Sequence, residues 1–288
     1  TFGIPMSEES LHASTLISEE GKQRVLQDLQ LPNTHFTKES SIGEFLEYFL
    51  GEEIVQKQIA PVLAGVYSGD LYQLSLASTL PYLVDYKNNY GSILKGFEAN
   101  RQQFEKAANK KFISFRNGLS AIIDRLEETL PDVTFMKNTK TRSVKKIGNR
   151  YVVFAGEETI EADVVVLAVP NETVREVLQD EALQKNLDKF TTASAITMYL
   201  GFDVPDCVLP ADGTGFIVSH NSDLVCNAST WTSRKWKHTS KEGNLLVRFF
   251  YKNSNPRYEE LAAMTDEQLI EVARQDIKVS LGIEEQPA

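Results

Sequence analysis

The sequence has few cysteines and no long apolar run. Only Cys207 and Cys226 occur among its 288 residues, too few for a disulfide framework and not spaced as zinc ligands. We therefore expect two reduced, partly buried thiols. No run approaches the roughly 20 apolar residues that span a bilayer, so we expect no transmembrane segment.

Positive charge is also scarce. The chain has 30 Lys and Arg residues against 40 Asp and Glu residues, a formal net charge of -10 and a pI near 5.1. Nucleic-acid binding needs a basic face, and electrostatic attachment to an anionic membrane needs the same. We therefore expect neither a nucleic-acid partner nor such attachment to a membrane. The two reduced thiols lead us to expect a cytoplasmic protein.

The familiar catalytic motifs are missing too. The four histidines, His12, His35, His220 and His238, have no metal-ligand spacing, and no metal site is predicted. His220 and Asp223 are near neighbours in "SHNSD", but a catalytic triad is assembled across a fold rather than along one loop, so loop hydrogen bonding is expected. The sequence contains neither G-x-G-x-x-G nor G-x-x-x-x-G-K-[ST]. No catalytic residue is assigned from these features.

The sequence does contain three regions that differ in predicted secondary structure. The first, residues 1–110, is predicted to be helical. Ser18 should cap a helix in "SEEGKQRVLQDL", and Ser41 with Glu44 should form a capping box for the next. Gly51 should end that helix. The following helix should be kinked by Pro61 and ended by Gly65. Another helix is expected after Ser75, and "SILKGFEANRQQFEKAANKK" is expected as a helical, solvated excursion.

Residues 111–178 read as a βαβββ-like segment. "KFISFRNGLSAIIDRLEETL" predicts a short strand, a turn at Asn117-Gly118 and an amphipathic helix. Strands are expected at 133–135, at 141–146 and from Tyr151, with "IGNR" turning the last two into a hairpin. The run "EADVVVLAVP", residues 161–170, predicts a buried strand that ends abruptly on small residues.

Residues 179–288 read as an antiparallel sheet followed by a helix capped by Thr265, Gln268 and Gly282. The fold class is therefore α+β. Its substrate-binding lobe would consist of residues 1–110 and 179–288, and residues 111–178 would form a second, partial lobe. Since the chain opens at Thr1 and closes on "IEEQPA" just after a helix, we also expect it to be a fragment of a longer polypeptide.

Longer sequence motifs point to one protein family. The stretch "SIGEFLEYFLGEEIVQKQIAPVLAGVYSGDLYQLSLASTLP" resembles the oxygen-dependent protoporphyrinogen and coproporphyrinogen oxidases, flavoenzymes of haem biosynthesis within the flavin amine-oxidase superfamily. The matching positions are Pro61, Leu63, Gly65, Val66, Tyr67, Gly69, Asp70, Leu74 and Ser75. "FISFRNGLSAIIDRLEETL" is similar to the family's "F-x-G-G-L" segment, although Asn117 replaces a glycine. The run "EADVVVLAVP" is similar to a strand of the same family. The stretch from Gly213 to Phe250 is similar to the soluble bacterial branch, which oxidises coproporphyrinogen.

This resemblance implies an FAD-binding lobe made of three separated pieces of chain. "EADVVVLAVP" would re-enter that lobe, with Ala168, Val169 and Pro170 close to the cofactor, because small side chains let backbone approach a flat ring. Thr141 would lie near the adenine end of FAD, or be an ordinary strand threonine. The N-terminal glycine-rich strand and the C-terminal segment of the family are absent. These 288 residues alone should therefore bind FAD weakly or not at all, and a stoichiometric flavin absorbance in the purified chain would contradict this.

The implied reaction is stepwise dehydrogenation of coproporphyrinogen III or protoporphyrinogen IX to the porphyrin. Hydride passes to the flavin, and O2 reoxidises the flavin with release of H2O2. Residues before 110 and after 190 would together form a wide apolar slot for the macrocycle. Gly65, Val66 and Tyr67 would lie beside it, or be a helix end and core packing. Phe216 and Trp231 would cover the ring, or be core aromatics.

The run "RKWKH" concentrates positive charge in an acidic chain. Arg234 and Lys235 would recognise the propionates of the substrate, or belong to a solvated basic loop. The porphyrin product could be handed to a ferrochelatase of the haem pathway. Two alternatives stay open: another enzyme of the superfamily, acting on an amine or a carotenoid, and a flavin-free porphyrin-binding lobe.

Overall fold

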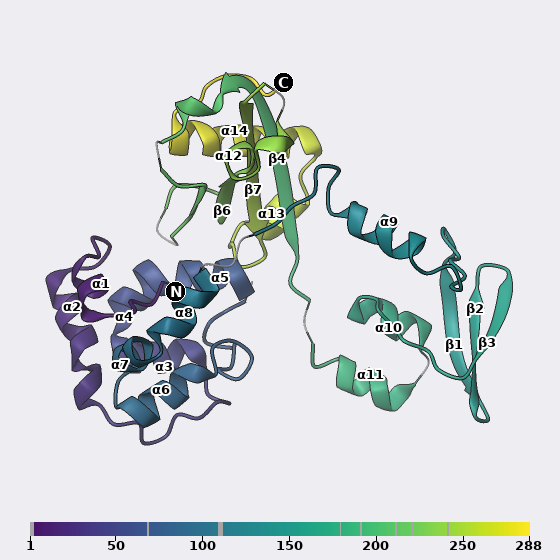
Figure 1. The fold of residues 1–288 in the computed structure, drawn as a ribbon, viewed down its shortest axis with the longest axis horizontal. Helices are drawn as coiled ribbons and strands as arrows, with labels where there is room; N and C mark the ends of the chain where they lie inside the picture. The colour runs from purple at the N-terminus through teal and green to yellow at the C-terminus, as the bar shows by residue number, and fades with distance from the viewer. Residues whose placement is uncertain are drawn as a thin grey trace. The chain divides into compact units, whose positions relative to one another are not determined.

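The computed structural model describes residues 3–67, 69–108, 112–178, 180–190, 192–210, 212–219, 222–240 and 242–288 (Figure 1). The chain divides into two compact units. Unit 1 comprises Thr1–Arg116 and Ala193–Ala288, and unit 2 comprises Asn117–Thr192. The sequence placed these boundaries near residues 110 and 178. The α+β fold class is confirmed.

The first part of unit 1 is helical. Its elements are α1 (Glu8–His12), α2 (Glu19–Leu26), η1 (Gln27–Gln30), α3 (Ile42–Leu50), α4 (Glu52–Ile54), η2 (Val55–Ile59), α5 (Ala60–Tyr67), α6 (Tyr82–Tyr90), α7 (Ile93–Ala99) and α8 (Arg101–Ala108). The predicted caps at Ser18, Ser41 and Gly51 are confirmed, but of the predicted Ser41–Glu44 capping box the structure shows only the hydrogen bond accepted by Ser41. Ser18 accepts a hydrogen bond from the Gly21 N–H and Ser41 accepts one from the Glu44 N–H, and Gly51, at φ 94, ends α3.

Two predicted helix limits were wrong. The helix before Gly65 continues to Tyr67, so Gly65 lies in its last turn. Directly before Pro61 the chain widens into the π-helical turn η2, which accommodates a residue that has no backbone N–H to donate. The helix expected after Ser75 begins only at Tyr82. Residues 75–79 instead form a turn in which side-chain hydroxyls bond the backbone, and this competes with a helix.

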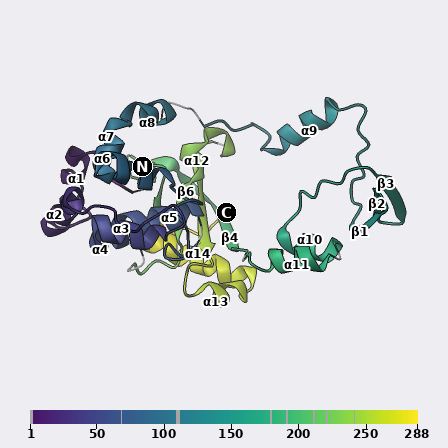
Figure 2. The same cartoon turned by 90° about the horizontal axis from the view of Figure 1, so that it is seen from below.

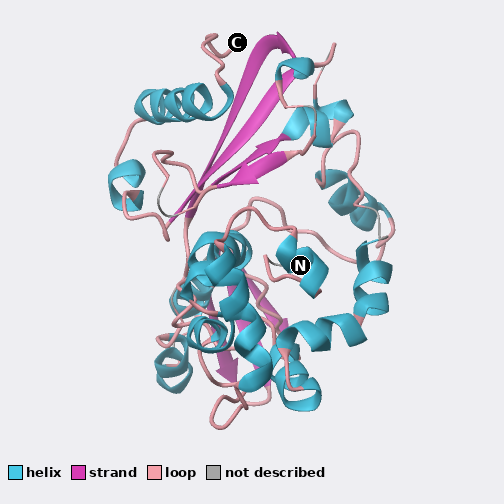
Figure 3. Ribbon diagram, turned by 90° about the vertical axis from the view of Figure 1, so that its left-hand side faces the viewer, coloured by secondary structure: helices cyan, strands magenta, loops and turns pink. Residues whose placement is uncertain are grey.

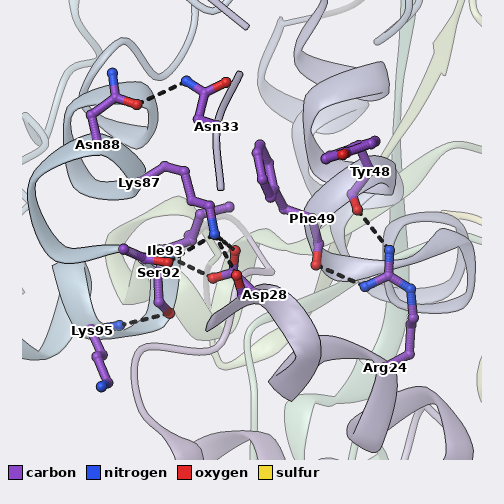
Figure 4. Close-up of polar contacts among 11 residues, drawn as sticks. Arg24, Asp28, Asn33, Tyr48, Phe49, Lys87, Asn88, Ser92, Ile93 and Lys95 are labelled. Carbon is purple, nitrogen blue, oxygen red and sulfur yellow. Dashed lines mark hydrogen bonds and ion pairs between the residues drawn. The ribbon is translucent and has the colours of Figure 1, made fainter. Parts of the chain in front are cut away.

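A buried ion pair joins three of these helical elements (Figure 4). Nζ of Lys87 lies 2.6 Å from Oδ1 of Asp28 and 2.8 Å from the carbonyl oxygen of Gly91. Oδ2 of Asp28 accepts the N–H of Ile93 at 2.7 Å. The ammonium group also lies 4.4 Å from the ring centroid of Phe49. Because both charges have several partners, they can be buried inside an otherwise apolar core.

Unit 2 has its own small sheet (Figure 2). It contains α9 (Ser120–Glu128), β1 (Thr141–Ile147), β2 (Arg150–Ala155), β3 (Glu158–Ala162), α10 (Asn171–Val177) and α11 (Glu181–Leu187), and β1, β2 and β3 form an antiparallel meander. The predicted hairpin is confirmed, since Ile147 pairs with Arg150 across a two-residue turn. In that turn Gly148 has a φ of 62, which favours glycine.

Of the strands predicted in the middle of the chain, two are not formed and a third is formed only in part. Residues 112–115 and 133–135 are not strands, and β3 ends at Ala162, so the run 161–170 is strand only at its beginning. This run is not buried either: Val164 is 76% exposed and Val166 is 85% exposed. A strand needs a hydrogen-bonding neighbour, and no described residue pairs with 164–168.

The second part of unit 1 is built on a four-stranded antiparallel sheet, as predicted (Figure 3). Its strands are β4 (Ala195–Pro205), β5 (Gly215–Ile217), β6 (Ala228–Trp231) and β7 (Asn244–Lys252), in the order β4-β7-β6-β5. Shorter elements are η3 (Asp206–Val208), α12 (Thr232–Lys235), η4 (Lys237–Thr239) and α13 (Tyr258–Ala262). The last helix, α14 (Asp266–Leu281), has the predicted capping box of Thr265 and Gln268, and Gly282 ends it at φ 69.

The two faces of this sheet differ. Alternate residues of a strand point to opposite faces, and β7 alternates strictly between buried and half-buried residues up to Tyr251. We call one side the packed face; it shares a hydrophobic core with α14 through Leu200, Trp231, Val247, Phe249 and Tyr251. We call the other side the open face; it carries Thr197, Tyr199, Ile217, Arg248 and Phe250.

Candidate functional site

The helical part and the sheet of unit 1 meet at the end of α5. Nζ of Lys252, at the end of β7, donates hydrogen bonds to the carbonyl oxygens of Ala64, at 3.3 Å, and of Gly65. Carbonyls in the last turn of a helix lack intrahelical partners and carry partial negative charge, so a cation is favoured there. Burial lowers the pKa of Lys252. This contact fixes β7 against α5.

Two cavities flank this junction. One has a volume of about 240 Å³ and is lined by Pro61, Gly65, Asn227, Asn255 and Arg257, among others. The other has a volume of about 310 Å³ and includes Leu71 and Tyr72. Both border Ala64 and Ser254. Small-molecule sites usually occupy about 300–1,000 Å³. The first cavity is smaller than this range and is lined about equally by polar and apolar atoms, and the second lies at the lower limit of the range. Neither has the width that the resemblance predicts for a tetrapyrrole slot. His220, predicted to bond within the adjoining loop, lies outside the described residues.

The open face of the sheet offers a broader surface. Tyr199 lies directly opposite Arg248 on the neighbouring strand, and Thr197 lies opposite Phe250. Tyr199 is 53% exposed and Ile217 is 47% exposed. The guanidinium carbon of Arg248 lies 4.4 Å from the Phe250 ring centroid and 5.6 Å from that of Tyr199. The face therefore combines two aromatic rings, aliphatic side chains and one cation.

The end of α5 reaches this face. A Cβ atom added to Gly65 would lie 3.8 Å from Cδ1 of Ile217 and would touch nothing more closely, so packing alone does not require glycine at this position. The next residue, Val66, is 55% exposed. Tyr67 differs from both: it packs against the helical core, and its hydroxyl donates to the carbonyl of Thr79. Gly65 and Val66 are thus available to a ligand, whereas Tyr67 serves the fold.

Phe216 and Trp231 lie on the packed face. Phe216 pairs with Ser229, which pairs with Phe249, so all three side chains point toward the core that contains α14. Trp231 is only 5% exposed. This differs from the prediction that these two aromatics cover a ring and favours the alternative that they are core residues. Because alternate residues of a strand point to opposite faces, both side chains lie on the packed face of the sheet.

Arg234 and Lys235 also differ from expectation. Arg234 forms an ion pair with Asp206 at 2.7 Å, donates to the carbonyls of Asp206 and Pro210, and lies over the ring of Trp231. Its donors are already occupied by protein acceptors, so binding a propionate would break these bonds. Lys235 is exposed, with Nζ 5.8 Å from the ring centroid of Phe112. Lys235 therefore fits the alternative of a solvated basic loop. Arg234 instead has a structural role, because acceptors within the protein bind its charge.

The residues predicted to contact FAD lie in unit 2. Thr141 begins β1 opposite Ala155, beside a register shift. Ala168, Val169 and Pro170 are exposed in the extended stretch before α10. A cavity of about 980 Å³ in this unit is lined by residues around Tyr151 and Leu178 and by none of these four. The small side chains would allow a flat ring to approach, but the described residues do not enclose a flavin. They therefore do not by themselves fit a complete cofactor site.

Sequence reasoning missed the open face. Its signal was present in "NLLVRFFYK", where Leu245, Val247 and Phe249 alternate with Leu246, Arg248 and Phe250. Both sets contain aromatics and aliphatics, so the alternation did not tell which set would be covered. The position of α14 decides that. Among the described residues, no helix is long and apolar enough to cross a membrane, and no His, Cys, Asp and Glu side chains cluster in a way that could hold a metal ion.

The chain matches proteins of one flavoenzyme family. The family model for flavin containing amine oxidoreductases matches residues 4–288, and the chain belongs to this family. Within it, coproporphyrinogen III oxidase of Bacillus subtilis (strain 168) is 28% identical over 292 residues, with coverage of 99% of this chain and 62% of the relative. Coproporphyrinogen III oxidase of Staphylococcus aureus (strain NCTC 8325 / PS 47) is 30% identical over 300 residues, covering 99% and 63%.

A solved structure is similar as well. The crystal structure of a protein from Exiguobacterium sp. 255-15, provisionally named a protoporphyrinogen oxidase, superposes with a TM-score of 0.83 at 30% identity. The comparison covers 100% of this chain and 62% of that one. The chain thus spans somewhat less than two thirds of the relatives that it matches.

Proposed function

We propose that the complete protein oxidises a porphyrinogen to the porphyrin, with coproporphyrinogen III as the preferred substrate. The observation that carries this proposal is the similarity to two coproporphyrinogen III oxidases, each along 99% of this chain. The motif around Gly65, Val66 and Tyr67, which carries the family resemblance, lies inside the matched region. The proposed electron acceptor is O2, with release of H2O2. The proposed location is the cytoplasm, where the porphyrin product could pass to a ferrochelatase.

The open face supports this substrate class. A porphyrinogen is a broad macrocycle of aromatic pyrrole rings with carboxylates at its edge. Tyr199 and Phe250 offer ring faces, and Ile217 and Val66 offer exposed aliphatic groups beside Gly65. Such a surface can hold the macrocycle in one orientation and keep water from one side of it. Orientation and desolvation are what a protein contributes when a cofactor carries the redox chemistry.

The proposed cofactor is FAD. When bound, FAD would supply the two-electron oxidation, and Thr141, Ala168, Val169 and Pro170 are the residues proposed to contact it. Because the described residues do not enclose a flavin, the roles assigned to this chain are limited to binding and orienting the substrate.

A substrate comparison tests the proposal. The complete protein is supplied in air with reduced coproporphyrinogen III, protoporphyrinogen IX or a polyamine, and porphyrin fluorescence and H2O2 are followed. We expect the largest kcat/KM for coproporphyrinogen III. Peroxide release with the polyamine alone would instead support an amine oxidase. Tight binding of porphyrin without any oxidation would support a porphyrin-binding lobe.

A further inference from the structure

We propose that Arg248 binds a carboxylate of the substrate on the open face, and that this contact favours porphyrinogens that carry more carboxylates. The inference rests on the proposed function and assigns one part of its specificity to one side chain. Arg248 stands in the central part of β7, which is hydrogen-bonded to β4 on one side and to β6 on the other. Its backbone is therefore held on both sides.

The donors of Arg248 are mostly unused. Nη1 donates to the Tyr199 hydroxyl at 3.0 Å. Nε is buried and has no hydrogen-bond partner among the described residues. No ion pair of Arg248 occurs in the described part of the chain either. A buried guanidinium N–H without an acceptor costs free energy, so the site is incomplete without an acceptor.

Three other cations near the sheet, Arg234, Lys252 and Arg257, are already occupied. Arg234 is bound by Asp206 and two carbonyls, and Lys252 is bound by the carbonyls of α5. Arg257 is paired with Glu260. Each of these side chains has protein acceptors for its charge, and Arg248 has only a hydroxyl. The four described strands of the sheet carry two cations, Arg248 and Lys252. Of these two, Arg248 is the one available to an anionic ligand.

The surroundings of Arg248 suit a carboxylate. Its direct neighbours on the open face are Tyr199 and Thr230 across the strands and Leu246 and Phe250 along β7, and none of these side chains is acidic. The Phe250 ring supports the flat guanidinium at 4.4 Å and so restricts its rotation. A restricted, half-buried guanidinium loses little entropy when it forms two parallel bonds to a carboxylate. The apolar neighbours also strengthen the interaction by excluding water.

The geometry also fits the rest of the ligand. Phe250 and Ile217 lie in the adjacent row of the same face, with Ala228 between them. Beyond Ile217 comes Gly65 of α5. A macrocycle lying on this row can place one edge substituent at Arg248. Coproporphyrinogen III has a propionate at four positions of its edge and protoporphyrinogen IX at only two, so the former presents a carboxylate in more orientations.

The test uses the complete protein with Arg248→Gln, Arg248→Lys and the matched control Arg234→Gln. For Arg248→Gln we expect KM for coproporphyrinogen III to rise on the order of 10-fold or more, which corresponds to a charge-assisted hydrogen bond. The preference for coproporphyrinogen III over protoporphyrinogen IX should fall. Arg248→Lys should recover part of both effects, because it keeps the charge but loses the planar fork. Arg234→Gln should leave both unchanged.

A direct binding measurement separates this inference from the proposed function. Coproporphyrin III, a stable tetracarboxylate, is titrated against the wild type and the variants, and quenching of its fluorescence gives Kd. Weaker binding by Arg248→Gln than by Arg234→Gln supports the role of Arg248 even if the protein oxidises no porphyrinogen. Equal Kd and KM in wild type and Arg248→Gln, in a protein that does oxidise coproporphyrinogen III, would overturn the role of Arg248 and leave the proposed function intact. Thermal unfolding of each variant confirms that it is folded.

Discussion

The packed face and the open face of the four-stranded sheet come from the same strands but have different tasks. On the packed face Val247, Phe249 and Tyr251 are 0% exposed against the core that includes α14. On the open face Tyr199 is 53% exposed, and Arg248 lacks an acceptor for a buried N–H. Along β7, residues buried in the core thus alternate with residues that we propose contact the substrate. Substitutions on the two faces should separate these properties.

The largest expected effect comes from a pair of adjacent phenylalanines. Phe249→Ala should lower the free energy of unfolding by about 3–5 kcal/mol, since it leaves a cavity in the core. Phe250→Ala should cost clearly less, because that ring is only half-buried, but it should raise KM for coproporphyrinogen III. Urea unfolding and steady-state kinetics of both variants provide the comparison. Similar losses of stability in the two variants would show that the faces are not distinct.

A second effect on the packed side involves Asp276 of α14. Its carboxylate accepts the N–H groups of Val225 and Cys226, each at 2.8 Å, and the Tyr251 hydroxyl at 3.1 Å. Asp276→Ala leaves these donors without an acceptor and should lower the free energy of unfolding by about 1–3 kcal/mol in all. Because Val225 and Cys226 border one junction cavity, the variant should also loosen that loop, which hydrogen exchange of the two amides would detect.

Asp276 also predicts a pH dependence. Burial raises its pKa above the ordinary value of 3.8, against the hydrogen bonds that favour the ionised form. The folded state therefore binds this proton more tightly than the unfolded state does. Its stabilising contribution is fully present below about pH 3.8 and is lost as the pH rises through the folded-state pKa. Relative to Asp276→Asn, the wild type should therefore lose stability as the pH rises from the unfolded-state pKa of Asp276 to its folded-state pKa. The opposite slope in the difference between the two proteins would contradict the raised pKa.

Arg234 gives a smaller effect, confined to stability. Replacing it with Gln removes an ion pair whose side chains are 20% and 26% exposed, and we expect a loss of about 1–2 kcal/mol in the free energy of unfolding. If Arg234 and Lys235 recognised propionates, as the sequence alone suggested, the double variant Arg234→Ala with Lys235→Ala would raise KM. The structure predicts instead that KM of the double variant stays near the wild-type value. A several-fold rise would return these residues to the substrate site.

Gly65 gives the smallest expected change in stability. An alanine there meets only Ile217, at 3.8 Å, so the free energy of unfolding should change by no more than about 0.5 kcal/mol. KM for coproporphyrinogen III should rise, because the added methyl group occupies space beside the open face. Gly96→Ala is the matched control, since its Cβ would lie 2.3 Å from Cβ of Tyr86 and should destabilise the protein. Unchanged kinetics in folded Gly65→Ala would place the macrocycle elsewhere.

Local signals in the sequence were reliable where the physical cause is itself local. Ser18, Ser41 and Thr265 bond amides within the next turn of chain, so their caps could be predicted. Gly148 supplies a left-handed residue to a hairpin turn, which needs no distant partner. The failures concern partners far along the chain. The run 161–170 has the composition of a buried strand, yet no described residue pairs with Val164 or Val166.

Residue patterns were sufficient to predict the class of fold, most of the helices, one hairpin and a family resemblance that indicates the chemistry. Which face of the sheet is covered depends on where α14 packs, and this places Trp231 in the core and Phe250 on the open face. Tertiary packing also decides which arginine is free, because Asp206 occupies Arg234 while no carboxylate reaches Arg248 in the described part of the chain. Side-chain type is written in the sequence, but whether a charge already has a partner depends on residues that only folding brings together.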